Sequence, residues 1–262
     1  MMEDEIIIAL NGKKVEELNQ NLINVMEYLF GALDYREIIK SEVVYNFAKA
    51  DFSITYQDIT KYVSMKTGEA KGVHSEEVDM FCSYLKENGI SDKTINTILL
   101  FQYGDGTLDG TGKTRFGYNV LMRKLENEII DANDELNKNK EFVIKTVKRA
   151  VLGEYEAINP DKPIVDAVYY GTVQKGYIAT RSQIISHIKK RSWDRIYSLH
   201  IGPLMIRPHA RYVDKKEMTE KEAHARKIVN FTWFNFVNDI KYISSSYSNY
   251  VPKPRRLKKE DE

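Results

Sequence analysis

Hydrophobic residues recur at three- and four-residue steps through the first hundred positions of this chain. From Val15 the pattern runs through Leu18, Leu22 and Met26 to Leu29, and such spacing places apolar side chains on one face of a helix. The same periodicity predicts four further helices, at 36–49, 55–66, 75–88 and 92–102. We therefore expect the first part of the chain to be a bundle of short helices.

Residues at the expected helix ends support this interpretation. Ser75 and Ser91 stand where N-cap residues would begin two of these helices, and Gly89 stands where a helix would end. The apolar run 6–10 is followed by an Asn-Gly turn signal. That run is either a strand or an N-terminal arm that docks elsewhere, and the pattern does not separate the two.

Helical periodicity returns between residues 114 and 152. This segment fits one long helix, or two helices with a weak joint, because polar residues gather at 131–134 and at 137–140. The best boundary in the chain follows, since the prolines of 159–163 disfavour helix on their N-terminal side and restart it afterwards. We predict a helical lobe with an N-terminal arm at 1–158 and a basic lobe at 159–262.

A final helix is predicted at 219–245. Thr219 and Glu222 match a capping box, and the segment 229–236 is apolar on most sides, which suits burial against another helix or a partner. The basic tail that follows is expected to be mobile. The predicted fold class is mainly α with a small β component, a helical N-terminal lobe and a basic C-terminal lobe.

Positive charge is concentrated in residues 174–213, although the formal net charge of the whole chain is only +1. This segment has one acid, Asp194, and eight basic residues: Lys175, Arg181, Lys189, Lys190, Arg191, Arg195, Arg207 and Arg211. Eight less one gives +7, so the remaining residues sum to −6. Concentrated positive charge interleaved with aromatic residues is typical of a surface that binds phosphate.

The basic segment fits a winged helix at 178–213. One helix is expected at 181–188 with Thr180 as its cap, followed by a turn at 189–191 and a second helix at 193–199. Gly202 and Pro203 can then turn a hairpin in the position of a wing. The second helix would present Ser192, Asp194, Arg195 and Ser198 to a major groove, and the wing would carry Arg207, His209 and Arg211 to phosphates or the minor groove.

Two other interpretations of this segment stay open. Its basic residues can line an RNA-binding groove in a helical protein, with Trp193, Tyr197 or Tyr212 stacking on bases. Alternatively, it is an ordinary solvated basic helix with Trp193 in the core. The residues predicted to contact nucleic acid are Lys175, Arg181, Lys189, Lys190, Arg191, Trp193, Arg195, Arg207, His209 and Arg211.

The glycine-rich loop 104–114 invites comparison with a phosphate-binding loop. That motif needs a glycine five residues before Gly-Lys-Ser/Thr, but the residue at that position is Thr107, and Gly106 is one place too early. A calcium loop fails as well, because its twelfth position should be a bidentate glutamate and is Phe116. We predict a flexible turn that leads into a helix at Thr114, with Lys113 and Thr114 as contacts for an anion.

The remaining cysteine and histidine residues predict no catalytic or metal site. Cys82 lies in an apolar periodic stretch and is predicted to be a small buried hydrophobe. His187, His200 and His209 are spaced by thirteen and nine residues, which matches no pair of metal ligands on one helical turn. We therefore predict no metal, no cofactor and no enzymatic activity.

The expected function is non-enzymatic binding of DNA or RNA, with a winged-helix regulator as the specific form. An alternative is a structural nucleoprotein or viral coat-type protein, because residues 1–60 sum to −6 and such polarity suits head-to-tail self-association. A nucleotide-dependent enzyme using loop 104–114 is the third hypothesis. Without a run of about 18 apolar residues, and with an acidic N-terminus, the chain is expected in the cytoplasm, without membrane contact.

Overall fold

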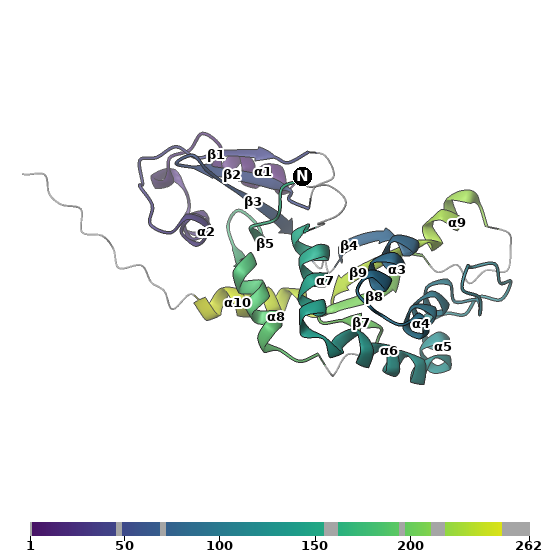
Figure 1. The fold of residues 1–262 in the computed structure, drawn as a ribbon. Coiled ribbons are helices and arrows are strands. Elements are labelled where there is room, and N and C mark those ends of the chain that lie inside the picture. The colour runs from purple at the N-terminus through teal and green to yellow at the C-terminus, as the bar shows by residue number, and fades with distance from the viewer. Residues whose placement is uncertain are drawn as a thin grey trace, which may run out of the picture. The chain divides into compact units, whose positions relative to one another are not determined.

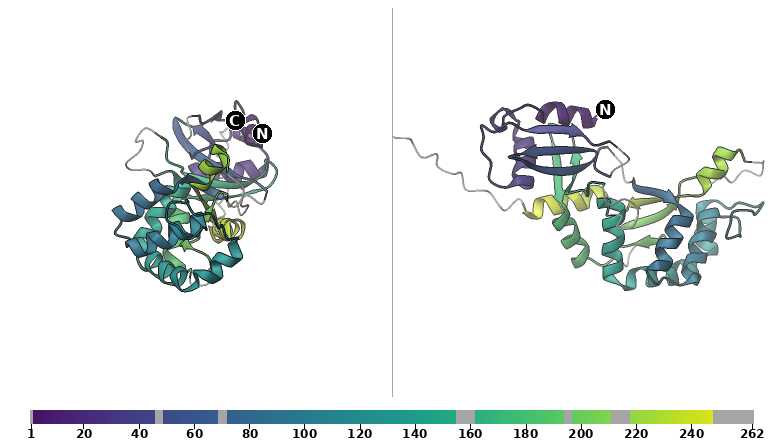
Figure 2. Two further views of the ribbon diagram at one scale, coloured as in Figure 1. Left: turned by 90° about the vertical axis from the view of Figure 1, so that its right-hand side faces the viewer. Right: turned by 45° about the horizontal axis from the view of Figure 1, so that its top comes forward.

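The computed structural model describes residues 2–45, 49–68, 72–154, 162–193, 197–210 and 218–247. These residues form a mixed α/β fold with one five-stranded and one four-stranded sheet (Figures 1 and 2). The prediction of a mainly α protein was therefore wrong. No helix in this part of the chain is long and apolar enough to cross a membrane.

The helices and strands occur in short runs along the chain. The helices are α1 (Met2–Leu10), a 3₁₀ turn η1 (Val15–Glu17), α2 (Gln20–Phe30), α3 (Val78–Glu87), α4 (Asp92–Tyr103), α5 (Tyr118–Lys124), α6 (Glu126–Lys138), α7 (Lys140–Leu152), α8 (Arg181–Lys190), α9 (Glu220–Arg226) and α10 (Phe236–Tyr247). The strands are β1 (Lys40–Val43), β2 (Phe52–Tyr56), β3 (Ile59–Lys66), β4 (Gly72–Glu77), β5 (Ala167–Gly171), β6 (Gly176–Thr180), β7 (His200–Ile201), β8 (Leu204–Pro208) and β9 (Ile228–Trp233).

The chain divides into two compact units, and each unit is assembled from separate segments. Unit 1 comprises residues 1–68, 165–183 and 237–262, and unit 2 comprises residues 69–164 and 184–236. This division differs from the predicted one at residue 158, because the chain passes from one unit to the other and back.

Unit 1 is built on the sheet β1-β2-β3-β5-β6, in which β3 and β5 run parallel and the other pairs are antiparallel. Helices α1 and α2 cover the sheet, and Ile6, Leu22 and Met26 from the helices share one core with Phe52 and Val63 from the strands. The run 6–10 is therefore helix and not a strand, and it packs in the core of its own unit rather than docking elsewhere as an arm. Its buried residues, Ile6 and Leu10, are four apart, which fits one helical face.

The helices predicted at 36–49 and 55–66 were wrong: the described part of the first range contains the strand β1, and the second contains the end of β2 and the whole of β3. In β2 the residues Phe52, Ile54 and Tyr56 are buried and alternate with partly exposed ones, which is the period of a strand with one covered face. Gln57 and Asp58 have positive φ angles of 47° and 62°, as a two-residue hairpin turn between β2 and β3 requires.

Unit 2 is built on the antiparallel sheet β4-β9-β8-β7. Val229, Phe231 and Trp233 of β9 alternate with less buried neighbours, and Phe231 packs edge-on against Phe81 of α3 with the ring centroids 4.9 Å apart. Helices α3, α4, α6 and α7 contact these strands. The helix predicted at 219–245 is thus three elements, α9, β9 and α10, although its capping box at Thr219 and Glu222 is confirmed.

Several helix ends match the sequence. The helix predicted at 92–102 is α4, and the side chain of Ser91 caps it. Gly89 follows the end of α3 with φ +76°, as expected for a stop. Ser75 lies within β4 and caps nothing. The segment 114–152 contains three helices, α5, α6 and α7, rather than one or two. Of its two polar stretches, 137–140 is a joint, because Asn139 ends α6 and caps α7, whereas 131–134 lies within α6.

A charged group is buried between the sheet of unit 2 and α7. The guanidinium of Arg149 donates to both carboxylate oxygens of Glu76, and His74 Nε2 lies 3.4 Å from Glu76 Oε1. Burial alone would raise the pKa of Glu76, but the hydrogen bonds from Arg149 and His74 outweigh it and hold that pKa below its ordinary value. The pair is a structural element of the core.

Candidate functional sites

The first helix of the predicted winged helix exists as α8. The side chain of Thr180 accepts from the amide of Gln183, and Ile184 and Ile188 are buried, as expected. The helix extends two residues farther than predicted, so Lys189 and Lys190 belong to its last turn rather than to a connecting turn.

The winged-helix arrangement itself was wrong. Residues 197–199 are not helical and the chain enters β7 at His200, while 194–196 lie outside the described residues. The hairpin turn at Gly202 and Pro203 is confirmed, since β7 pairs with β8 across it. However, β8 also pairs with β9, so the hairpin is an integral edge of the four-stranded sheet and no free wing.

The structure gathers four cations at the end of α8, which we name the α8 basic cluster: Lys140, Lys189, Lys190 and Arg191. Lys189, Lys190 and Arg191 are exposed. Lys140, from the start of α7, donates to the carbonyl oxygen of Arg191 at 2.5 Å and approaches that of Ile188 at 3.4 Å. Sequence reasoning missed Lys140 because it lies 49 residues before Lys189, and its only signal was the polar stretch 137–140.

The aromatic residues of this segment differ in accessibility. Trp193 is only 8% exposed and packs under the guanidinium of Arg191, 4.8 Å from the ring centroid. The core interpretation of Trp193 is therefore correct, and its faces are not open to a base. Tyr197 is 89% exposed, and Tyr212 lies outside the described residues.

The remaining predicted contacts do not join the cluster through any described interaction. Arg207 and His209 are exposed on and just beyond β8, where Asn230 Nδ2 lies 3.1 Å from His209 Nδ1. Lys175 and Arg181 belong to unit 1. Arg195 and Arg211 lie outside the described residues.

The glycine-rich loop is held by hydrogen bonds between its own residues. Its amide groups donate to its own side chains: Thr107 and Gly112 to Asp105, Gly110 to Thr107, and Thr111 to Asp109. A buried guanidinium from Arg226 bonds Asp105 Oδ2 at 3.1 Å and the carbonyl oxygen of Tyr103 at 2.7 Å. These amides are not free to converge on a phosphate, as a phosphate-binding loop requires.

The helix that follows this loop begins at Tyr118, so the predicted start at Thr114 was wrong. Lys113 and Thr114 are exposed in the loop. Their role as anion contacts stays a prediction. A helix N-terminus at Thr114, which would have favoured an anion there, is not present.

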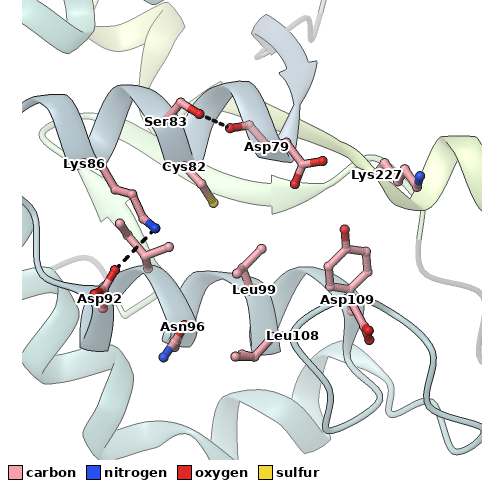
Figure 3. Close-up of a pocket in the computed structure, with 12 residues that line it drawn as sticks. Asp79, Cys82, Ser83, Lys86, Asp92, Asn96, Leu99, Leu108, Asp109 and Lys227 are labelled. Atoms are coloured by element: carbon pink, nitrogen blue, oxygen red, sulfur yellow. Dashed lines mark hydrogen bonds and ion pairs between the residues drawn. The ribbon is translucent and has the colours of Figure 1, made fainter.

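A groove of about 480 Å³ lies between α3 and α4 in unit 2. Its lining comes from three separate parts of the chain: Asp79, Cys82, Ser83, Lys86, Asp92, Ile95, Asn96, Leu99, Tyr103, Leu108, Asp109 and Lys227. Figure 3 shows the sulfur of Cys82 pointing from α3 toward Leu99 on α4. No sequence motif marks this groove, because its lining is assembled from α3, α4, the loop after α4 and Lys227.

Cys82 is partly buried in this groove, and burial, with the nearby carboxylate of Asp79, raises the pKa of its thiol to about 11. A raised pKa favours the folded state below the ordinary value near 9, and this contribution is lost as the pH rises through about 11. The thiolate is the nucleophilic form, so the folded thiol should react slowly at neutral pH.

We expect alkylation of Cys82 by iodoacetamide at pH 7.5 to be slower in the folded protein than in urea by roughly a hundredfold. The folded rate should rise about tenfold per pH unit between pH 8 and 10. Cys82 is the single cysteine of the chain, so mass spectrometry reports it directly. A rate that levels off near pH 9 would contradict the raised pKa.

Within the described residues, no group of three or more His, Cys, Asp or Glu side chains is placed to hold a metal ion. The candidate sites are therefore a cationic surface and a polar groove, each within unit 2. No protein-family model matches this chain, and no curated protein shows significant similarity to it.

Proposed function

We propose that this protein binds nucleic acid through its phosphate backbone, using the α8 basic cluster. The observation that carries the proposal is the arrangement of Lys189, Lys190 and Arg191 as exposed consecutive cations at one helix end. Among the described residues, no carboxylate lies within ion-pair distance of Lys189 or Lys190. Their charge is available to an external polyanion.

Lys140 makes this helix end compatible with an anion. The C-terminus of a helix carries partial negative charge from its unbonded carbonyl groups and repels phosphate. The ammonium of Lys140 donates to carbonyl oxygens at the end of α8, so it offsets that charge. The three exposed cations that follow can then attract phosphate without an opposing dipole.

The proposed mode is contact with phosphates rather than reading of bases. The described residues of the predicted major-groove helix, 193 and 197–199, are not helical, and Trp193 is buried. Tyr197, with its exposed ring, remains able to stack on an unpaired base. Binding should therefore depend strongly on salt and weakly on sequence.

Replacing Lys189 and Lys190 by alanine is expected to weaken binding of a labelled 20-nucleotide duplex about tenfold or more at 50 mM salt. The slope of log K against log salt should decrease by about two, because each lost phosphate contact removes about 0.9. Fluorescence anisotropy over a salt series measures both quantities. A single-stranded RNA of equal length, measured in parallel, shows which nucleic acid is preferred.

The matched control is Lys13→Ala/Lys40→Ala, which removes the same charge from exposed positions of unit 1. It should retain the affinity and nearly the full salt slope. Equal losses in both double variants would mean diffuse attraction and contradict a cluster. Size-exclusion chromatography of the wild-type complex tests the nucleoprotein alternative, which requires large particles.

A further inference from the structure

One face of the four-stranded sheet in unit 2 is polar. Phe231 of β9 is buried on the core face, so its neighbour Asn230 lies on the opposite face. Asn230 pairs directly with Arg207 of β8 and with Ser75 of β4, and directly paired residues lie on the same face. Ser75 and Arg207 are exposed. This side of the sheet therefore presents polar groups to solvent.

His209 continues this face beyond the end of β8. Its amide donates to the carbonyl oxygen of Ile228 at 2.9 Å, so the pairing with β9 extends one residue past β8. His209 follows Arg207 by two residues, and side chains at that spacing leave a strand on the same side, about 6.5 Å apart. One phosphate group can therefore contact both. We name the set Ser75, Arg207, His209 and Asn230 the polar sheet face.

A chain of hydrogen bonds orients the imidazole of His209. Ser75 Oγ donates to Asn230 Oδ1 at 2.6 Å, so the other end of the amide, Nδ2, is the atom that lies 3.1 Å from His209 Nδ1. An amide nitrogen donates and does not accept, and Nδ1 therefore accepts. The proton of the neutral ring is then on Nε2. Nε2 bonds to no described residue and can donate to an anion.

The guanidinium of Arg207 carries a charge that no acid in the described part of the chain offsets. Its one hydrogen-bond contact there is Met205 Sδ at 3.6 Å, which is a weak acceptor, and no described carboxylate forms an ion pair with it. Guanidinium groups bind phosphate through parallel N–H donors. Arg207 and His209 thus direct donors from two side chains at one anion.

An aromatic ring lies beside Arg207. Tyr118, the first residue of α5, is 38% exposed, and its ring centroid lies 5.8 Å from Arg207 Cζ. The ring is held from two directions, since its hydroxyl donates to Ser198 Oγ at 3.1 Å and Phe101 packs edge-on against it. A fixed, partly exposed ring beside a phosphate contact is typical of a surface on which an unpaired base stacks.

We propose that the polar sheet face binds one nucleotide of a single-stranded nucleic acid, with the phosphate at Arg207 and His209 and the base on the ring of Tyr118. This inference rests on the proposed function and adds a second site, outside the α8 basic cluster, at which single and double strands differ. A base that is paired and stacked in a duplex cannot reach the ring, so Tyr118 selects the single strand.

One carboxylate opposes phosphate binding here. Glu77 is exposed at the end of β4, two residues after Ser75 and therefore on the same face. Glu77 and His209 both pair with Ile228, which places them two strand spacings apart, about 9.5 Å. At that distance the carboxylate repels phosphate without touching it. Glu77→Gln should strengthen phosphate binding about twofold.

Thymidine 5′-monophosphate tests the site without the rest of a strand. The chain has five histidines, and the NMR signals of the His209 ring are identified by their loss in His209→Gln. We expect the mononucleotide to shift these signals saturably, inorganic phosphate to do so with about threefold lower affinity or less, and thymidine to leave them unchanged. Arg207→Gln should weaken mononucleotide binding about tenfold. Signals that do not move at about 20 mM mononucleotide, or that move equally with thymidine, would overturn the proposal.

A labelled 12-nucleotide oligothymidylate tests whether the ligand is a strand. Arg207→Gln and Tyr118→Leu should each weaken its binding about fivefold to tenfold at 50 mM salt, measured by fluorescence anisotropy. Tyr118→Phe keeps the ring and should bind like wild type. A 12-base-pair duplex should be insensitive to Tyr118→Leu. The matched control is Arg123→Gln, which removes the charge of an exposed arginine that bonds only within α5.

The outcomes separate this site from the α8 basic cluster. Unchanged strand affinity in Lys189→Ala/Lys190→Ala, with a loss in Arg207→Gln, would remove the cluster and keep the sheet site. Equal strand affinity in Arg207→Gln and Arg123→Gln would refute the sheet site, and mononucleotide binding would then indicate a free nucleotide as its ligand. Arg207 is exposed, so Arg207→Gln should fold and decides the question even if Tyr118→Leu does not fold.

Discussion

Replacing Arg149 by methionine is expected to lower the free energy of unfolding by about 3–5 kcal/mol. Both charged side chains of the Arg149–Glu76 pair are at most 8% exposed, so the substitution leaves the Glu76 carboxylate buried, with His74 as its remaining partner among the described residues. The guanidinium also covers the Tyr84 ring, 4.5 Å from its centroid. Urea unfolding followed by circular dichroism measures the loss.

The matched variant is Arg149→Met/Glu76→Gln, which removes both charges. It should recover about half of the lost stability, because an amide is far less costly to bury than an unpaired carboxylate.

The pH dependence of the free energy of unfolding gives a second check. A depressed pKa at Glu76 contributes stability above the ordinary value near 4.5, and this contribution is lost as the pH falls below it. The double variant should lack that dependence, and a loss under 1 kcal/mol in Arg149→Met would refute the prediction.

The second large effect is expected from Gly176→Ala at the start of β6. A methyl group there would lie 1.9 Å from the hydroxyl oxygen of Tyr169. The Tyr169 ring is 1% exposed and cannot turn aside, and its hydroxyl donates to the carbonyl oxygen of Thr172 and accepts from Asn21. Overpacking of this kind costs about 1–3 kcal/mol or more, so unit 1 should unfold at a lower temperature.

Gly72→Ala is the control, because a methyl group there meets nothing within 4 Å and its φ is not in the left-handed region. It should change the melting temperature by no more than a degree or two. Calorimetry on both variants makes the comparison. Similar melting temperatures for Gly176→Ala and wild type would show that the β5–β6 hairpin adjusts its path.

The sequence predicted helices better than strands for a physical reason. A helix such as α4 is decided locally, by Ser91 at its cap and by one apolar face, and both were visible. In 52–66, a strand that buries every second residue also buries residues four apart, such as Phe52 and Tyr56, and four residues is close to one helical turn. The turn at Gln57 and Asp58 also lacks the usual Asn-Gly or Asp-Gly signal. Pairing with a distant strand decided the outcome there, and pairing partners are not visible locally.

The candidate sites divide in the same way. Lys189, Lys190 and Arg191 could be found because they are consecutive. Lys140 could not be assigned to them, since only the packing of α7 against the end of α8 brings it there. The groove could not be predicted from the sequence at all. Its lining residues, such as Asp79, Tyr103 and Asp109, come together only when α3, α4 and the following loop have packed.

The order in which the chain leaves the ribosome constrains how unit 1 can fold. Its central pairing joins β3 to β5, from Val63 with Ala167 to Lys66 with Tyr170, and the whole of residues 69–164 lies between them in unit 2. At about 5–20 residues per second, synthesis of the intervening segment takes roughly 5–20 s. During that interval β3 is an unprotected strand edge, the kind of surface that recruits chaperones or aggregates. Unit 2 in turn needs β8 and β9, so its sheet cannot be completed before residue 233 has been synthesised, and products truncated before that residue should be insoluble.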